Sequence, residues 1–141
     1  MLFKHLQYHG SFRFGLRHGE GISYHENKMV YQGTFENDLP HGKGKYYCSD
    51  GSVYEGEMQN GRFHGEGTLR YPNGARYEGK FSHGLRHGKG AIFNSNGTKL
   101  KGTFEYNRSF GSLIFTDANG KTQEHVYRFT KTINGQTTIL K

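Results

Sequence analysis

The sequence repeats with a period of 23 residues, and this feature restricts the fold more than any other. Tyrosines mark the period at Tyr8, Tyr31, Tyr54 and Tyr77, with Leu100 in the fifth position. A glycine follows two residues after each of these positions, and Phe or Met follows four residues after. A fixed period of about 20–50 residues is typical of proteins built by stacking one small structural unit. The chain is therefore expected to be an array rather than a globular domain.

Five repeats cover residues 8–122, divided as 8–30, 31–53, 54–76, 77–99 and 100–122. The first four carry a His-Gly pair followed by a further glycine, whereas the fifth has Phe110 and Leu113 at the histidine and last glycine positions. Residues 1–7 are predicted to form an N-terminal edge strand. Residues 123–141 are predicted to form a capping hairpin around Asn134 and Gly135, since Asn-Gly is a strong hairpin signal.

Each repeat is predicted to be a β-hairpin. Tyr54, Gly56 and Met58 alternate with polar residues, so their side chains share one face of a strand. A second strand near residues 65–71 also alternates. A four-residue turn at 59–62 would place Gly56 opposite Gly67 and Tyr54 opposite Leu69. A three-residue loop at 72–74 would place Leu69 opposite Tyr77 of the next repeat.

These hairpins predict an all-β fold, an elongated single-layer twisted antiparallel meander with terminal capping strands. Hydrophobic residues make up only 32% of the chain, which is too few for a deep core, while glycines and aromatic residues are plentiful. One face should carry an aromatic ladder in which each ring lies over a neighbouring strand. A Cβ atom beneath a ring would hold it off, so glycines are structurally required. These glycines are Gly33, Gly56, Gly67, Gly79 and Gly90.

The pattern resembles the MORN repeat (membrane occupation and recognition nexus). The similarity lies in Tyr54-Glu55-Gly56-Glu57-Met58, Asn60-Gly61, His64-Gly65-x-Gly67 and Asn73-Gly74, and it extends over about four-fifths of the chain. The tryptophan often found where Met58 stands is absent from every repeat. The resemblance implies a twisted antiparallel sheet that tethers or binds, as in junctophilins, radial-spoke head proteins and retinophilin, which grips a myosin tail. It implies no catalytic chemistry.

Neither a metal site nor an active site is expected, and no cofactor is predicted. His18, His41, His64 and His87 form a column, but neighbours in the column start too far apart to share a zinc ion and no carboxylate or cysteine recurs beside them. These histidines are expected to hydrogen-bond the turn backbone instead. Cys48 is the single cysteine and is interpreted as a filler of a strand position. The protein is therefore predicted not to be an enzyme.

The leading functional hypothesis is a protein-interaction adaptor that holds an extended or helical segment of a partner along the aromatic trough. The trough would comprise the side chains of the central repeats: Tyr31, Phe35, Tyr54, Met58, Tyr77 and Phe81. Turn residues would form its rim: Arg62, Phe63, Leu85 and Arg86. Aromatic side chains are favoured anchors at protein interfaces.

The alternative hypothesis is a peripheral module that binds anionic phospholipids through basic side chains. The formal net charge is +7, which favours acidic partners in general. Nucleic acid is the less favoured partner, because strand packing already explains the spacing of the aromatic residues. The sequence contains neither a signal-peptide core nor about 18 consecutive apolar residues, which predicts a cytoplasmic location. The resemblance adds the cytoskeleton, the cilium or a membrane surface as settings.

Overall fold

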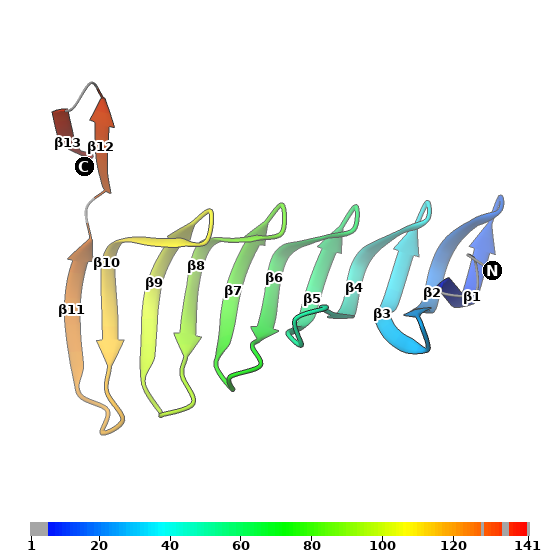
Figure 1. The fold of residues 1–141 in the computed structure, drawn as a ribbon, viewed down its shortest axis with the longest axis horizontal. Coiled ribbons are helices and arrows are strands. Elements are labelled where there is room, and N and C mark those ends of the chain that lie inside the picture. Colours follow the sequence, from blue (N-terminus) through cyan, green and yellow to red (C-terminus); the bar gives the residue numbers. More distant parts are fainter. Residues whose placement is uncertain (1–5, 128, 134–135, 141) are drawn as a thin grey trace.

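Eleven strands form one antiparallel sheet in which every strand pairs with its neighbours in sequence (Figure 1). The computed structural model describes residues 6–127, 129–133 and 136–140. The strands are β1 (Leu6–Arg13), β2 (Leu16–His25), β3 (Lys28–Glu36), β4 (Leu39–Tyr47), β5 (Val53–Gln59), β6 (Arg62–Arg70), β7 (Arg76–Ser82), β8 (Leu85–Phe93), β9 (Lys99–Glu105), β10 (Arg108–Thr116) and β11 (Thr122–Tyr127). The predicted all-β meander is confirmed, and the described residues contain no helix.

The two ends of the array differ from its interior. Most of the predicted N-terminal edge strand, residues 1–5, lies outside the described residues, and β1 begins at Leu6. At the other end, β11 joins the large sheet through β10. β12 (Phe129–Ile133) and β13 (Gln136–Leu140) pair with each other, with Ile133 opposite Gln136. The predicted turn residues 134–135 of that hairpin lie outside the described residues.

Two kinds of turn set the strand register. Within the third repeat, Gln59 lies opposite Arg62, so that Asn60 (φ 50°) and Gly61 (φ 80°) form the turn in the left-handed region. Such turns match the right-handed twist of the flanking strands. Between repeats, the Tyr71 N–H donates to the Ala75 carbonyl at 2.8 Å around the predicted three-residue loop. The predicted register follows: Gly56 lies opposite Gly67, and Leu69 lies opposite both Tyr54 and Tyr77.

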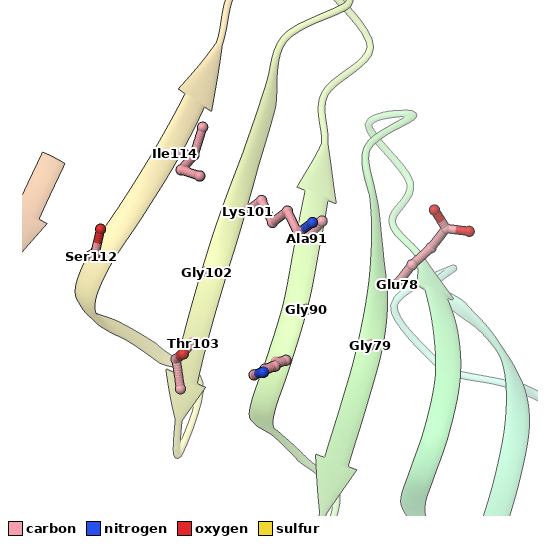
Figure 2. A pocket seen from close by; sticks show the side chains of 10 residues that line it. Glu78, Gly79, Gly90, Ala91, Lys101, Gly102, Thr103, Ser112 and Ile114 are labelled. Carbon is pink, nitrogen blue, oxygen red and sulfur yellow. The ribbon is translucent and has the colours of Figure 1, made fainter. Parts of the chain in front are cut away.

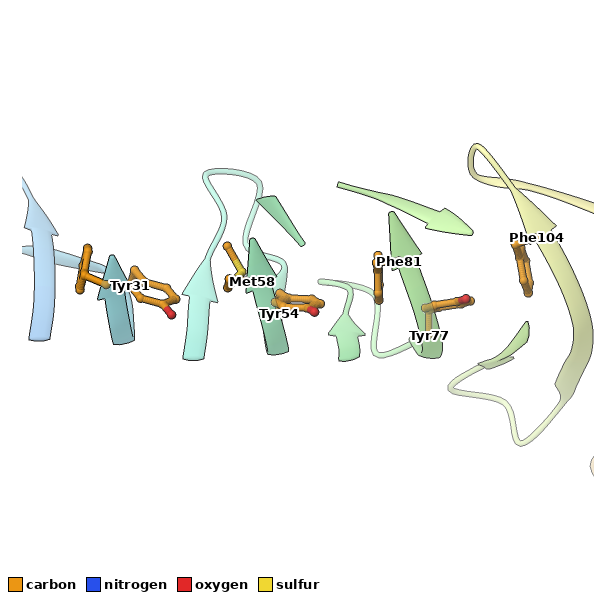
Figure 3. Packing of buried hydrophobic residues seen from close by; sticks show 7 residues of the cluster. Tyr31, Tyr54, Met58, Tyr77, Phe81 and Phe104 are labelled. Atoms are coloured by element: carbon orange, nitrogen blue, oxygen red, sulfur yellow. The ribbon is translucent and has the colours of Figure 1, made fainter. Parts of the chain in front are cut away.

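The core is a single row of buried side chains that runs across the strands and consists of aromatic residues and Met58 (Figure 3). Tyr54 meets Phe81 of the next repeat edge to face at a centroid distance of 5.2 Å. Tyr77 meets Phe104 in the same way at 5.1 Å. Edge-to-face rings contribute about 0.5–1.5 kcal/mol beyond the area that they bury. Each repeat is thus fastened to the next by the contact that also forms its own core.

The tyrosine rings lie flat because glycines leave room for them. The Tyr54 hydroxyl donates to the Glu57 carbonyl at 2.6 Å, which holds the ring across the strand pair. A Cβ atom at Gly67 would overlap the Tyr54 ring. A Cβ atom at Gly56 would lie 2.6 Å from the backbone oxygen of Glu66, which cannot move away without breaking the sheet. Neither glycine can therefore gain a Cβ atom without displacing the ring or the neighbouring strand.

The fifth repeat solves the same packing problem with different residues. Leu100 replaces the tyrosine, and Leu113 replaces the glycine that the ring would cover. Leu113 is fully buried, and a Cβ atom at Gly102 would overlap its Cδ2 atom. The side chain of Leu113 therefore fills, from the neighbouring strand, the space that a tyrosine ring fills elsewhere. The two replacements compensate each other.

A further side chain from the second strand of the hairpin covers three of the repeat tyrosines, Tyr8, Tyr54 and Tyr77. Phe63 stacks on Tyr54 with a centroid distance of 3.9 Å and an interplanar angle of 8°. Arg17 and Arg86 occupy the same repeat position as Phe63, and their guanidinium groups each lie 5.8 Å from the ring that they cover, Tyr8 and Tyr77 respectively. We call Arg17, Phe63 and Arg86 the lid residues.

The arginine lids are held by the turn of the next repeat. Arg17 donates from Nε to the Asp38 carboxylate at 2.8 Å and from Nη2 to the Asp38 carbonyl at 2.6 Å. Arg86 makes the corresponding contacts with Asn107, and its backbone N–H donates to the Asn107 side-chain oxygen at 2.9 Å. Above Phe63 the equivalent turn residue is Gly84. The turn residue next to each arginine lid is thus Asp or Asn, which accepts its hydrogen bonds, whereas the turn residue next to the phenylalanine lid is Gly.

The compensation in the fifth repeat can be transferred to the third. Gly67→Leu alone should lower the free energy of unfolding by about 3 kcal/mol or more, because the new side chain overlaps the Tyr54 ring. The double variant Tyr54→Leu/Gly67→Leu should recover on the order of 2 kcal/mol of that loss. Urea denaturation of the two single variants and the double variant gives the coupling. Additive losses would contradict the exchange of space inferred from Leu100 and Leu113.

The Arg17–Asp38 contact should make stability depend on pH in the acid range. The hydrogen bonds from Arg17 hold the pKa of Asp38 below its ordinary value of 3.8. A lowered carboxyl pKa stabilises the fold above the unfolded pKa, and this stabilisation is lost as the pH falls through the folded pKa. At neutral pH the free energy of unfolding of the wild type should exceed that of Asp38→Asn by on the order of 0.5 kcal/mol. The difference is small because the side chains of Arg17 and Asp38 are both partly exposed. The difference in Tm should vanish at pH values below the folded pKa.

Arg17→Met keeps the apolar part of the lid and serves as the matched variant. It should reproduce the acid profile of Asp38→Asn, and the double variant should lose no further pH-dependent stability. A Tm difference that stays constant down to the most acid pH would assign the effect to another group.

Candidate functional site

The predicted aromatic trough is the core of the protein. Its six side chains, Tyr31, Phe35, Tyr54, Met58, Tyr77 and Phe81, are between 0% and 3% exposed. Burial raises the pKa of Tyr31 and of Tyr77 to about 12, so both hydroxyls remain protonated hydrogen-bond donors at neutral pH. These side chains offer no surface in this conformation. A partner that depends on them would have to act through the residues around them.

The four predicted rim residues have different roles. Arg62 is exposed, Leu85 is half-buried, and Phe63 and Arg86 are the half-buried lids described above. The sequence interpretation missed the third lid, Arg17, and its anchor Asp38. A signal for it exists in the sequence, because Arg17–Asp38 and Arg86–Asn107 share a spacing of 21 residues.

The open feature of the sheet is a groove on the face opposite the tyrosine rings, which we call the glycine groove. It consists of two hollows of about 420 and 480 Å³ that share Glu78 and Gly79. The first spans β4 to β7 and is lined by Lys43, Glu55, Gly56, Glu57, Glu66, Gly67, Thr68, Glu78 and Gly79. The second spans β7 to β10 and is lined by Glu78, Gly79, Lys89, Gly90, Ala91, Lys101, Gly102, Thr103, Ser112 and Ile114.

The period-two alternation of the strands builds this groove. Residues on either side of each core glycine point to the opposite face, so they form two walls along a floor of glycine backbone. Figure 2 shows Glu78, Ala91, Lys101 and Ile114 along one wall, with Thr103 and Ser112 along the other. The same columns that fix the core therefore also fix the groove.

Charge divides the glycine groove into two halves. The lining of the first hollow contains four glutamates and one lysine. Lys43 lies directly opposite Glu57, Lys45 opposite Glu55 and Lys80 opposite Glu66. Arg76 also pairs with Glu78 at 3.5 Å, so each of the four glutamates has a basic neighbour outside or at the margin of the hollow. In the second hollow the cross-strand neighbour of Lys89 is Thr103, and those of Lys101 are Ala91 and Ile114. Among the lining residues alone, those over β4–β7 are mainly glutamates and are called the acidic half, whereas Lys89 and Lys101 over β8–β10 define the basic half.

Two histidines of the column, His18 and His41, accept hydrogen bonds from turns of the next repeat. The Asn37 N–H donates to His18 Nδ1, and the Asn60 N–H donates to His41 Nδ1, both at 3.3 Å. The predicted structural role is thus confirmed for these two histidines. Within the part of the chain that the structure describes, no three His, Cys, Asp or Glu side chains gather closely enough to hold a metal ion.

Cys48 is half-buried and has a free thiol. Burial, with a smaller contribution from the Asp50 carboxylate, raises the pKa of this thiol. A protonated thiol is a poor nucleophile. The interpretation of Cys48 as the filler of a strand position is corrected by the structure, because Cys48 follows β4 and its backbone closes the turn to Ser52. The described part of the chain contains no helix with the length and hydrophobicity that a membrane span requires.

Comparison with known proteins gives one family. The MORN repeat model matches four consecutive segments, residues 8–29, 31–53, 54–76 and 77–99. The fifth repeat, in which leucines replace the core tyrosine and glycine, lies beyond these matches. A search of curated proteins finds no match. The four matched segments span more than half of the chain and coincide with the hairpins of the sheet, and the chain therefore belongs to the MORN repeat family.

Proposed function

We propose that this protein is a non-catalytic adaptor that holds an extended segment of another protein in the glycine groove. The observation that carries the proposal is the division of the groove into an acidic and a basic half along one continuous glycine floor. The tyrosine face is closed by its own rings and lids, whereas the glycine groove is open to solvent. A rigid array that presents such a groove fits binding and positioning better than chemistry.

The groove sets the length of the segment. Seven strands, β4 to β10, line it, and neighbouring strands lie about 4.8 Å apart, which gives a span of about 29 Å. An extended peptide rises about 3.3 Å per residue, so about nine residues would fill the groove. This length suits a linear segment rather than a folded domain.

The charges set the composition of the segment. Lys or Arg side chains of the segment would lie over Glu55, Glu57 and Glu66, and Asp or Glu side chains would lie over Lys89 and Lys101. Ile114, which is 43% exposed, offers an apolar contact on one wall of the basic half. Complementary charge mainly improves specificity and the association rate, while the apolar contact contributes affinity.

An anionic membrane is the second candidate, and it fits this face less well. The net charge of +7 attracts anionic lipids. However, acidic and basic side chains face each other across the strands of this face, so it presents a mixed rather than a uniformly basic surface to lipid headgroups. A flat bilayer also cannot follow a groove.

Selection from a random dodecapeptide library tests the proposal. Peptides with a basic half and an acidic half should be enriched. Glu66→Lys should weaken binding of a selected peptide about 5- to 20-fold, because it reverses a charge in the acidic half. Isothermal titration calorimetry at low and high salt measures the change.

Glu105→Lys makes the same charge change at an exposed residue that does not line the groove, and it should leave the affinity near wild type. Vesicles of phosphatidylcholine with and without phosphatidylserine provide the competing arm. Binding to phosphatidylserine vesicles that is insensitive to Glu66→Lys, together with no enriched peptide class, would overturn the adaptor proposal.

A further inference from the structure

The first strand leaves one edge of the sheet open. Within the described residues, β1 pairs with β2 and with no other strand. An unpaired edge presents backbone N–H and C=O groups that can receive another strand. The strands from β2 to β8 show what such an edge can accept, because each of them pairs glycine with glycine on both sides, as Gly79 does with Gly67 and Gly90.

The same edge exposes side chains that are buried in every other repeat. Phe12 is 61% exposed, whereas Phe35, Met58, Phe81 and Phe104 at the equivalent positions are 2–3% exposed. The tyrosine of the preceding repeat covers Phe35, Phe81 and Phe104, with ring centroids 5.1–5.2 Å apart. Phe12 lacks this cover because no repeat precedes β1 among the described residues. Phe14, in the adjoining turn, is 89% exposed. The edge is therefore both unpaired and apolar.

We propose that β1 pairs with β1 of a second copy of this chain, antiparallel, with Gly10 on the two-fold axis. This register places Tyr8 opposite Phe12 of the second copy and glycine opposite glycine, as the interior pairs do. The strand is self-complementary, because Tyr8 and Phe12 stand at equal distances from Gly10. Aromatic cross-strand pairs are among the stabilising pairs of antiparallel sheets.

The charges of β1 are compatible with this register. Gln7 would lie opposite Arg13 of the second copy, and His9 would lie opposite Ser11. No two lysines, arginines or carboxylates of like charge face each other across the axis. The two sheets would then join into one sheet through a closed, two-fold interface.

The opposite edge is a poorer partner for β1. On the face of β11 that continues the tyrosine row, Gln123 lies opposite Phe115 and His125 lies opposite Leu113. This strand contains no glycine and would bring polar side chains against Phe12. Head-to-tail association would also continue without closing, whereas pairing through β1 stops at two copies. The geometry therefore favours a dimer over a filament.

Opposite substitutions at one exposed residue test the register in solution. In Gln7→Glu, the new carboxylate of each copy would lie opposite Arg13 of the other copy, which gives two ion pairs per dimer. The dimer dissociation constant should therefore fall about 2- to 30-fold. Gln7→Arg should raise it by a similar factor. Sedimentation velocity over a wide concentration range measures the constant. Circular dichroism should show the same fold and the same monomer stability for both variants.

Phe12→Ser should abolish the dimer. Tyr106→Ser removes an aromatic side chain that is 64% exposed in a turn far from β1, and it should leave the dimer intact. A wild-type chain that stays monomeric up to millimolar concentration would overturn the proposal, as would a dimer that Phe12→Ser does not affect. Capture of a strand from a different protein by a monomeric chain would also overturn it.

Cross-linking tests the register directly. In a Cys48→Ser background, chains with His9→Cys mixed with chains with Ser11→Cys should form a disulfide under mild oxidation, because directly opposite Cα atoms lie about 4.5–5.5 Å apart. Either variant alone should cross-link little, since equivalent residues would be about 8 Å apart. Equal yields in all three samples would contradict pairing about Gly10. A failure of peptide selection in the glycine groove would leave this result unaffected.

Discussion

The packing of a tyrosine ring across a pair of facing glycines is the contact on which the rest of this structure depends. The ring can lie flat over Gly67 only because neither Gly56 nor Gly67 carries a Cβ atom. Lying flat, it reaches Phe81 of the next repeat, so the contact that fills one hairpin also fastens the following one. A chain with only 32% hydrophobic residues can therefore form an ordered sheet without a second layer. The fifth repeat supports this interpretation, since Leu113 replaces both the glycine and the volume of the missing ring.

A single sheet has two faces, and the same glycine columns give them different properties. On the tyrosine face, rings and lids exclude water and hold the repeats in register. On the other face, the residues beside each glycine form two charged walls, and the glycine backbone between them forms a continuous floor. Substitutions on the groove walls can change the charge pattern without touching the core. Binding specificity can thus vary in such an array while the fold stays constant.

Much of the fold could be predicted because the period fixes the register. The pairs Gly56–Gly67 and Leu69–Tyr77 follow from turn lengths and alternation alone, both of which are local properties. The candidate site was less predictable. Alternation assigns Tyr54 and Phe81 to one face, but it does not say whether that face is open, because burial depends on how far the rings lean and on what covers them. Arg17 was missed for the same reason, since it reaches Asp38 only when the next repeat stands beside it.

By itself, the sequence determined the repeat, the hairpins and the glycine requirement, because each of these depends on spacings within about 23 residues. Only the tertiary structure decided which face is closed and which is open. It also decided that Phe12 is exposed while its counterparts are buried, since that difference depends on a neighbouring repeat and not on the residue itself. The physical reason is that solvent exposure in a stacked array is a property of neighbours, which the local sequence pattern does not contain.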